Sequence, residues 1–324
     1  MSKPIIVTGA AGFIGRNVVA ELNRRGHENL LLVDFLGKDE KWKNLIGLRF
    51  NDIIDPDTFF NSIEQKTAQP VDAIIHLGAC SSTTERDADF LLRNNYRYTR
   101  VLCEWSLQNK ARFVYASSAA TYGDGSRGYS DKDEITPTLA PLNMYGFSKQ
   151  LFDLWALSHG VVDKVVGLKY FNVYGPYEDH KGDQRSVVHK AYQQIASAGS
   201  VKLFKSYHRE FADGEQKRDF VYVRDAVEVT LHFALDRRNV GGIFNVGTGE
   251  ARSWNDLARA VFSALGKKPK IEYIDMPEIL REKYQYFTQA DVNKLRSQGG
   301  YAKPFTSLEV GVADYVSSYL SQTN

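Results

Sequence analysis

Short apolar runs alternate with longer amphipathic segments through the first half of the chain. The runs carry few charges and end in small or polar residues, as strands buried on both faces do, and they lie at residues 5–8, 30–33, 73–77, 113–117 and 165–170. Between them, the spacing of apolar residues predicts helices at 13–25, 88–108 and 144–158. This alternation predicts an α/β fold of Rossmann type, with a doubly wound parallel sheet covered by helices on both faces.

The pattern loosens after residue 174. An exposed loop, a helix at 186–198 and a strand at 201–204 are expected next, and strands at 220–223 and 242–246 are expected to return to the sheet. The remainder predicts helices at 254–265 and 308–320 and a strand at 270–274. We therefore expect a dinucleotide-binding Rossmann domain at residues 1–172, with 219–249 returning to it. Residues 173–218 and 250–324 would form a smaller, interleaved α/β substrate lobe.

Composition narrows the classes of function. The 324 residues are 43% hydrophobic and 25% charged with a net charge of +2, which is typical of a globular protein and gives no case for nucleic-acid binding. Two cysteines, Cys80 and Cys103, cannot form a disulfide framework or a four-cysteine metal site, and we expect no metal. No signal-peptide core or bilayer-spanning stretch occurs, so we expect a cytoplasmic protein without a membrane partner.

A glycine-rich loop follows the first strand and begins the first helix. In the run from Thr8 to Gly15 the glycines have the spacing G-x-x-G-x-x-G. Gly9 allows the tight turn, Gly12 lets the backbone approach a pyrophosphate, and Gly15 allows close packing of the helix. The free N–H groups of the helix N-terminus would face the phosphates. The loop predicts a dinucleotide site with contacts from Gly9, Ala11, Gly12, Phe13, Ile14 and Gly15.

Asp34 ends the second strand, where an acidic residue binds the adenine ribose of the dinucleotide. A carboxylate there favours NAD because it repels the 2′-phosphate of NADP. The closely following Lys38, Lys41 and Lys43 could neutralise such a phosphate or could be part of a solvated loop. Charges alone leave NAD and NADP open.

Tyr145 and Lys149 stand four residues apart at the start of a predicted helix, on one of its faces. We expect the ammonium, with the positive nicotinamide ring, to lower the pKa of the phenol so that it can act as a base. Ser118 ends the strand upstream, where its hydroxyl could bond the alcohol or carbonyl that changes oxidation state. Each motif alone is weak, but serine, tyrosine and lysine in this order on a Rossmann scaffold predict hydride-transfer chemistry.

The turn after the fourth strand offers further cofactor contacts. Small residues at Gly78 and Ala79 would let the cofactor pass, whereas His76 before them is expected to be structural. Asn94 and Asn95 on the following helix could orient the loops on the cofactor side or could be amides on the helix surface. The contacts expected from this region are Leu77, Gly78, Ala79, Cys80, Ser81 and Asn94.

With these residues the chain resembles the sugar-nucleotide epimerases of the extended short-chain dehydrogenase/reductase superfamily, and within it those that act at C6 of ADP-linked heptose. Segments spread over nearly the whole chain carry the resemblance. They lie at residues 78–85, 115–123, 169–176, 180–182, 217–223 and 284–291. Ala-Cys-Ser-Ser-Thr-Thr, His-Lys-Gly and Phe-Thr-Gln-Ala-Asp are the narrower signals.

The resemblance implies an NADP-dependent isomerase that inverts C6 of ADP-heptose for the inner core of lipopolysaccharide and that forms a homo-oligomer. Transient oxidation to a ketone and return of the hydride would invert the carbon. Tyr145 and Lys181 would be the two acid/base residues, with Ser118 and Lys149 assisting. Lys41 would meet the 2′-phosphate, with Phe35 beside the ribose. The substrate contacts implied are Ser118, Asn172, Lys181, Asp183, Lys190, Lys205, Ser206, Arg218 and Tyr284.

Some positions depart from the family pattern. Phe35 replaces an expected polar residue, Pro56 an expected lysine and Lys190 an expected substrate histidine, while residues 208–216 resemble an insertion. The alternatives are a hexose 4-epimerase, which has no need of Lys181, a 4,6-dehydratase and a cofactor-sensing protein without turnover. A dehydratase requires an acidic pair after the catalytic strand, where this chain has Ala119 and Ala120, and a sensor has no need of the Tyr–Lys pair.

Overall fold

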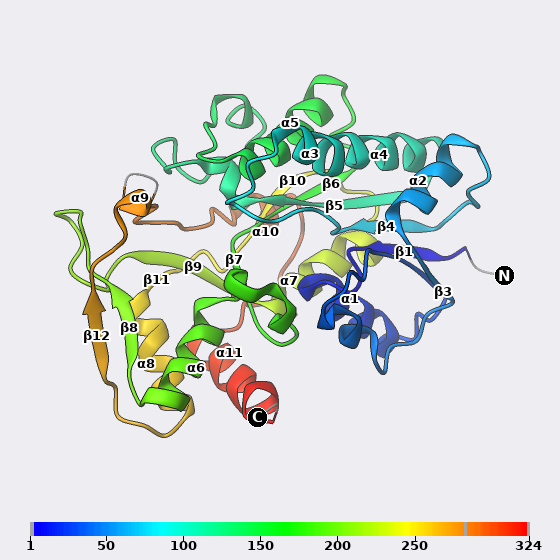
Figure 1. Ribbon diagram of the computed structural model, residues 1–324. Coiled ribbons are helices and arrows are strands. Elements are labelled where there is room, and N and C mark those ends of the chain that lie inside the picture. Colours follow the sequence, from blue (N-terminus) through cyan, green and yellow to red (C-terminus); the bar gives the residue numbers. More distant parts are fainter. Residues whose placement is uncertain (1–2, 282–283, 323–324) are drawn as a thin grey trace.

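The computed structural model describes residues 3–281 and 284–322. A seven-stranded, wholly parallel sheet crosses the molecule in the order β10-β6-β5-β4-β1-β2-β3 (Figure 1). Its first six strands in sequence have the 3-2-1-4-5-6 order of a Rossmann fold, which confirms the predicted fold class. The strands are β1 (Ile5–Thr8), β2 (Leu30–Val33), β3 (Asp52–Ile54), β4 (Ala73–His76), β5 (Arg112–Ser118), β6 (Val166–Tyr170) and β10 (Gly242–Val246).

Helices cover both faces of this sheet (Figure 1). On one face α1 (Phe13–Arg24) packs against α7 (Val223–Leu231). The other face carries α2 (Pro56–Glu64), α3 (Ala88–Leu91), α4 (Tyr98–Gln108) and α5 (Met144–Ser158). A π-helical stretch, Leu92–Arg97, joins α3 to α4, so the helix predicted over 88–108 is one run with an irregular centre. Apolar side chains of β1, β4 and β5 lie between the layers and are almost wholly buried.

The rest of the chain forms a second group of elements beside the sheet (Figure 1). A three-stranded sheet joins β7 (Asn172–Tyr174), β9 (Lys217–Tyr222) and β11 (Ala251–Ser253), and β8 (Val201–Phe204) pairs with β12 (Ile271–Ile274). Around them pack α6 (Val187–Ala198), α8 (Trp254–Ala264) and α11 (Leu308–Tyr315). Short helices α9 (Glu278–Arg281) and α10 (Asn293–Ser297) complete the described elements.

One predicted strand pairs differently from what we expected. The segment around 220–223 was expected to return to the main sheet, but it belongs to β9, which pairs with β7 and β11. The main chain leaves the large sheet after β6 and immediately forms β7, which offers a second sheet edge to Phe220–Tyr222. An apolar run predicts a buried strand but does not say which edge it joins. The other expected strand, β10, does join the main sheet beside β6.

The order of the strands opens a crevice at one edge of the sheet. Strand β1 lies between β2 and β4, so the chain order reverses there and a crevice opens at the carboxyl ends of these strands. Gly9, directly after β1, donates its N–H to the Val33 carbonyl at 2.8 Å, which holds the first turn against β2. Among the described residues, no helix combines the length and apolar character that crossing a bilayer requires.

Candidate active site

A cavity of about 680 Å³ opens at the carboxyl ends of β1, β4 and β5. The glycine-rich loop, the end of β5 with the start of α5, and the segment 180–188 line it together. The structure thus brings together most of the predicted site residues. Those that line the cavity are Gly9, Gly12, Phe13, Ile14, Gly15, Asp34, Lys41, Leu77, Gly78, Ala79, Ser81, Ser118, Tyr145, Lys149, Asn172 and Lys181.

The glycines are needed because backbone segments approach one another closely. A Cβ on Gly15 would lie 2.0 Å from the Gly9 carbonyl oxygen, and a Cβ on Gly9 would lie 2.7 Å from the backbone nitrogen of Gly78. Gly9 also has a φ of +66°, which side chains other than glycine rarely adopt. The turn after β1 therefore packs directly against the turn after β4. This leaves the N-terminus of α1 open to the cavity, so the backbone fits a pyrophosphate group.

At the end of β2 the Asp34 carboxylate has both oxygens engaged. Oδ2 accepts the Ala11 N–H at 2.8 Å, and Oδ1 lies 2.6 Å from the Lys41 ammonium. Lys43 instead pairs with Glu40, away from Asp34. Phe35 is 49% exposed and leaves its ring in solvent. The position that selects between NAD and NADP therefore has a carboxylate whose charge is already balanced by one lysine.

Helix α5 positions the tyrosine and lysine of the motif. Asn143 caps its N-terminus by accepting the Gly146 N–H at 2.8 Å, which fixes where the helix starts. Lys149 reaches β5 and donates to the Ala116 carbonyl at 2.8 Å. Tyr145 is hydrogen-bonded to Ser118, whose side chain is only 9% exposed at the end of β5. The three predicted groups therefore meet in one corner of the cavity.

Burial has the largest effect on the electrostatics of this corner. Burial raises the pKa of Tyr145, and the hydrogen bond from Ser118 opposes that rise only partly. Burial also lowers the pKa of Lys149 to about 8, although Asp153 and Cys80 act in the opposite direction. In the protein without cofactor, burial is the largest effect on the pKa of Tyr145, and the Lys149 ammonium is bonded to β5. The lowering expected from Lys149 together with a bound, positively charged nicotinamide ring stays a prediction.

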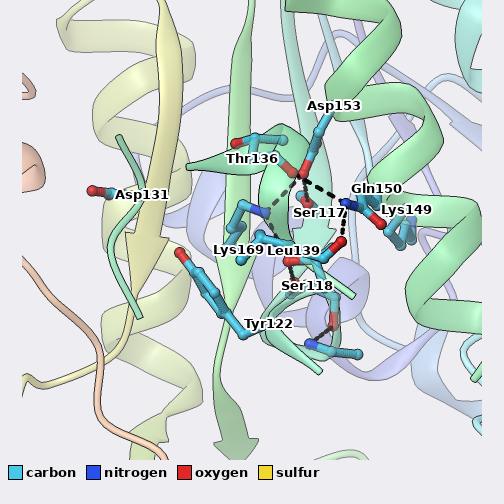
Figure 2. Close-up of polar contacts among 12 residues, drawn as sticks. Ser117, Ser118, Tyr122, Asp131, Thr136, Leu139, Lys149, Gln150, Asp153 and Lys169 are labelled. Carbon is cyan, nitrogen blue, oxygen red and sulfur yellow. Dashed lines mark hydrogen bonds and ion pairs between the residues drawn. The ribbon is translucent and has the colours of Figure 1, made fainter. Parts of the chain in front are cut away.

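A buried polar network fixes α5 on the sheet (Figure 2). Asp153, one helical turn after Lys149, accepts hydrogen bonds from Tyr115 at 2.9 Å and Ser117 at 2.7 Å. It also forms an ion pair of 3.0 Å with Lys169 of β6. Lys169 in turn donates to Thr121 at 2.7 Å, and Thr121 donates to the Ser118 carbonyl at 2.8 Å. The network thus connects α5, β5 and β6 directly beneath Ser118.

Lys181 reaches the cavity from another direction. It lies in 3₁₀ turns at Asp179–Gln184, bent at Gly182, which follow β7. Its ammonium is 5.3 Å from the centre of the Phe13 ring at the start of α1. Burial lowers the pKa of Lys181, the negative charge of Glu178 raises it, and the positive charge of Lys190 lowers it. A lysine that sequence spacing alone would place in a solvated loop is therefore half-buried beside the glycine-rich loop.

Arg218 and Tyr284 lie together beyond this corner, without lining the cavity. The Arg218 guanidinium is 5.2 Å from the Tyr284 ring centre and 5.7 Å from that of Trp254. Trp254 Nε1 donates to the Tyr284 hydroxyl at 2.8 Å, and Trp254 does line the cavity. Sequence reasoning missed Trp254, whose place as the first residue of α8 gave no signal.

The remaining predicted substrate residues lie outside the cavity lining. Lys190 donates to the Asp183 carbonyl at 2.6 Å, and Asp183 itself is exposed. Lys205 is exposed and pairs with Asp275 at 3.2 Å, while the Ser206 N–H bonds Asp213. The structure therefore brings Asn172 and Lys181 to the cavity but leaves these four beside or away from it.

The turn after β4 is held by Asn95. This amide, 1% exposed, accepts the Cys80 N–H at 2.9 Å and donates to the Cys80 carbonyl at 2.9 Å and to Ser148 at 3.0 Å. Asn94, the predicted residue, donates to Asn95 instead and does not line the cavity. The π-helical stretch turns the second asparagine toward the turn, which regular helical spacing did not predict.

His76 has a structural environment, as predicted. Its ring nitrogens bond Thr8 at 2.7 Å and Thr99 at 2.8 Å, and burial lowers its pKa to about 3. Neither cysteine is in a disulfide, and residues 3–281 and 284–322 contain no cluster of three or more His, Cys, Asp or Glu side chains that could hold a metal.

Comparison with known proteins places this geometry among related chains. The model of the NAD dependent epimerase/dehydratase family matches residues 5–247. The ADP-L-glycero-D-manno-heptose-6-epimerase of Nitratidesulfovibrio vulgaris (strain DP4) is 56% identical over 98% of both chains. The crystal structure of the Helicobacter pylori ADP-L-glycero-D-manno-heptose-6-epimerase is 30% identical with a TM-score of 0.80, over 97% of this chain and 95% of that one. A UDP-glucuronic acid 4-epimerase of Bacillus cereus in complex with NAD is 25% identical with a TM-score of 0.77, over 99% of both chains.

Proposed function

The chain belongs to the NAD dependent epimerase/dehydratase family, and we propose that it interconverts the two C6 epimers of ADP-linked glycero-manno-heptose. One observation carries the choice. Two groups able to exchange protons, Tyr145 on α5 and Lys181 on the segment after β7, line the same cavity from different elements. An epimerase needs such a pair because the reacting hydroxyl points in opposite directions in the two epimers. The heptose 6-epimerases named above supply the substrate class.

The cavity fits a nicotinamide dinucleotide. The open N-terminus of α1 would hold the pyrophosphate, and Lys149 would hold the nicotinamide ribose. The small side chain of Ala79 would leave room for the cofactor between them. When bound, the cofactor accepts a hydride from the carbinol carbon and returns it. We propose NADP, because Asp34 is engaged by Ala11 and neutralised by Lys41, so a 2′-phosphate would meet a lysine and not a free carboxylate.

The chain's own residues move the protons. In one epimer Tyr145, as the phenolate that the positive ring of the bound oxidised cofactor would stabilise, takes the proton of the C6 hydroxyl, and Ser118 holds the resulting carbonyl oxygen. In the other epimer the hydroxyl faces Lys181, which gives or takes the proton there. Bound substrate and cofactor would fill the cavity that both groups line and so keep water away from the ketone. Lys149, anchored to the Ala116 carbonyl, would hold the nicotinamide ribose from the same helix as Tyr145.

The substrate diphosphate needs cations at the outer end of the cavity. Arg185 lines it, and its buried Nε has no hydrogen-bond partner within the part of the chain that the structure describes. Arg218, held beside Tyr284 and Trp254, is a second guanidinium able to bind phosphate oxygens after a small movement. We propose these two as the diphosphate contacts. Asn172, which lines the cavity, would bond the sugar.

The proposed function also concerns the oligomeric state, location and pathway of the enzyme. We propose a cytoplasmic homo-oligomer that makes the heptose donor for the inner core of lipopolysaccharide, with residues 173–218 and 250–324 as its substrate lobe. The exposed apolar side chains of Leu142, Met144 and Phe147 near the start of α5 support association between copies. Light scattering behind size-exclusion chromatography measures the assembly, and a monomer at micromolar concentration would contradict it.

The function is tested on purified protein without added cofactor. We expect the protein to carry bound dinucleotide and to convert either C6 epimer of ADP-heptose to the same equilibrium mixture, followed by anion-exchange chromatography. Mass spectrometry of the released dinucleotide should find the 2′-phosphate. A protein that carries dinucleotide but leaves both epimers unchanged, while it turns over a UDP-hexose, would refute the heptose assignment.

A further inference from the structure

The segment that carries Lys181 is closed at its base by one carboxylate. Glu178 lies at its start and Ser186 at its end, and the Glu178 side chain accepts the Ser186 N–H at 2.5 Å and the Ser186 hydroxyl at 2.6 Å. The main chain adds a bond from the Lys181 N–H to the Glu178 carbonyl at 3.0 Å. Glu178 is completely buried. We call residues 178–186 the lysine loop.

Two neighbouring helices hold the lysine loop in place. The Tyr315 hydroxyl of α11 donates to Glu178 at 3.1 Å. Asp179 bonds His189 of α6 at 3.0 Å and the Tyr319 hydroxyl. The lysine loop is therefore attached to these helices through two adjacent acidic side chains, the buried Glu178 and the exposed Asp179. Removing Glu178 would free the base of the loop, whereas Asp179 would keep its own contacts.

The hydrogen-bond partners of Glu178 carry no charge. They are Ser186 and Tyr315, and no ion pair to Glu178 occurs among the described residues. A buried carboxylate without a direct cation acts on other charges through a medium that screens poorly. One of these charges is the Lys181 ammonium of the same loop, whose pKa Glu178 raises.

Other charged groups face Lys181 from the elements around it. Lys190 of α6 lowers the pKa of Lys181. His180 of the same loop bonds Asn44 at 3.1 Å, and its own pKa is lowered first by burial and then by Lys41 and Lys181. From α1 the uncharged Phe13 ring lies 5.3 Å from the ammonium. Glu178 is thus the group that favours the protonated form against burial and Lys190.

We propose that Glu178 is a positioning residue of the active site, which closes the lysine loop and supplies the negative charge that keeps Lys181 protonated between turnovers. The proposal rests on the proposed function, in which Lys181 exchanges a proton with substrate. A proton donor on one side of the cavity must be charged when the substrate arrives. Glu178 and Lys190 act on it with opposite signs, so they would set together how readily the proton leaves.

The test measures the protonation of Lys181 directly. Holoenzyme is labelled briefly with acetic anhydride over a range of pH, and mass spectrometry gives the extent of acetylation at Lys181. Because only the neutral amine reacts, the profile yields an apparent pKa. We expect Glu178→Gln to lower that pKa by about one pH unit, which is the usual influence of a nearby opposite charge. Tyr315→Phe, which removes a bond to Glu178 but keeps the charge, should leave the pKa where it is.

Lys190→Gln provides a second variant of opposite sign. With the like charge removed, Glu178 acts unopposed and the apparent pKa of Lys181 should rise. An unchanged or lower pKa in Lys190→Gln overturns the proposal even if Glu178→Gln does not fold. An unchanged pKa in a folded Glu178→Gln protein, or an equal shift in Tyr315→Phe, overturns it as well.

The labelling needs no turnover, so it separates this proposal from the proposed function. An unmodified protein that fails to epimerise ADP-heptose refutes the function, whatever the labelling finds. If the function holds, the alkaline limb of the kcat profile of Glu178→Gln should move to lower pH with that of Lys181 labelling. A variant in which kcat falls equally at every pH would show a purely structural role and overturn the proposal.

Discussion

The carboxylate of Asp153 lies 3.0 Å from the ammonium of Lys169, and neither side chain is exposed to solvent. The two come from α5 and β6, and Ser117 of β5 bonds the same carboxylate (Figure 2). Tyr115 of β5 donates to it as well. Because Tyr145, Lys149 and Asp153 follow one face of α5, this contact fixes the orientation of the helix that carries the tyrosine. The contact between Ser118 and Tyr145 is therefore supported by the protein itself, without a bound ligand.

Replacing Asp153 by Asn should lower the free energy of unfolding by about 3–5 kcal/mol, because the Lys169 ammonium would stay buried without its counter-charge. Urea denaturation of the two proteins measures the difference. The matched control is Glu104→Gln, which breaks the half-exposed Arg100–Glu104 pair and should cost less than about 1 kcal/mol. Equal losses in the two variants would mean that the buried pair is not a principal support of α5.

Tyr145→Phe should reduce kcat by about 10² or more, because the phenol is the group that exchanges the hydroxyl proton beside Ser118. Lys181→Ala should do the same from the other side of the substrate. Both variants should keep their bound dinucleotide and their melting temperature. Tyr98→Phe serves as control, since that hydroxyl contacts the Pro56 carbonyl and lies outside the cavity lining. Full activity in Tyr145→Phe and Lys181→Ala would refute the assignment of two proton-exchanging groups.

Lys41→Gln should shift the cofactor preference toward NAD. The change removes the ammonium that neutralises Asp34, and the affinity for NADP relative to NAD should fall about tenfold, as expected for one charge-assisted hydrogen bond. Fluorescence titration of cofactor-free protein measures both affinities. Lys43→Gln, on the same turn but paired with Glu40, should leave the ratio as it is. A similar change in both variants would point to general surface charge and not to a specific contact.

Gly15→Ala should abolish dinucleotide retention during purification. The added Cβ would lie 2.0 Å from the Gly9 carbonyl oxygen, so the glycine-rich loop would have to move away from the pyrophosphate position. Absorbance of the protein and its extracted cofactor gives the bound fraction. Gly160→Ala is the comparison: its φ of +61° makes alanine strained there, but the added Cβ would meet no atom within 4 Å, so the dinucleotide should stay bound. Retention of cofactor by Gly15→Ala would contradict the packing argument.

Because His76 is buried in its neutral form, the folded protein should lose free energy of unfolding in mild acid. Burial lowers its pKa from 6.5 to about 3, so the unfolded chain binds a proton between these values that the folded chain does not. The stability contributed by the neutral ring is complete above pH 6.5 and is lost as the pH falls toward 3. From pH 6.5 to 5 the free energy of unfolding should fall by about 2 kcal/mol more than in His76→Gln. Parallel pH profiles of the two proteins would contradict this.

Local signals in the sequence were sufficient for the regular elements. The bounds of α5, β1 and β2 are those expected, because an asparagine cap or a short apolar run marks each one within a few residues. The short strand β3 begins with Asp52 and has no buried residue, so hydrophobic pattern could not find it. The pairing of β9 and the π-helical centre before α4 depend on neighbours distant in sequence, which spacing does not report.

The candidate site divides in the same way. The glycine-rich loop, Ser118, Tyr145 and Lys149 were predicted because each stands at a fixed position relative to a strand or helix. The raised pKa of Tyr145 in the protein without cofactor follows from burial, which a sequence does not give. Sequence could name Asn94 and Asn95 together but not say which one faces the turn, because that depends on an irregular helix. Glu178 was missed, because it looks like part of a charged loop until its burial is known.

The turns that follow β1 and β4 pack closely at Gly9 and Gly78, but the two positions differ in what they tolerate. A Cβ on Gly9 would lie 2.7 Å from the Gly78 nitrogen at a φ of +66°, whereas a Cβ on Gly78 would lie 3.1 Å from the Gly9 nitrogen and the Thr8 hydroxyl. Natural drift and laboratory selection should therefore leave Gly9 untouched and act on the outer rim, at Asp34, Phe35 and Lys41. A library that randomises the rim should yield altered cofactor choice, whereas one that randomises position 9 should return only glycine.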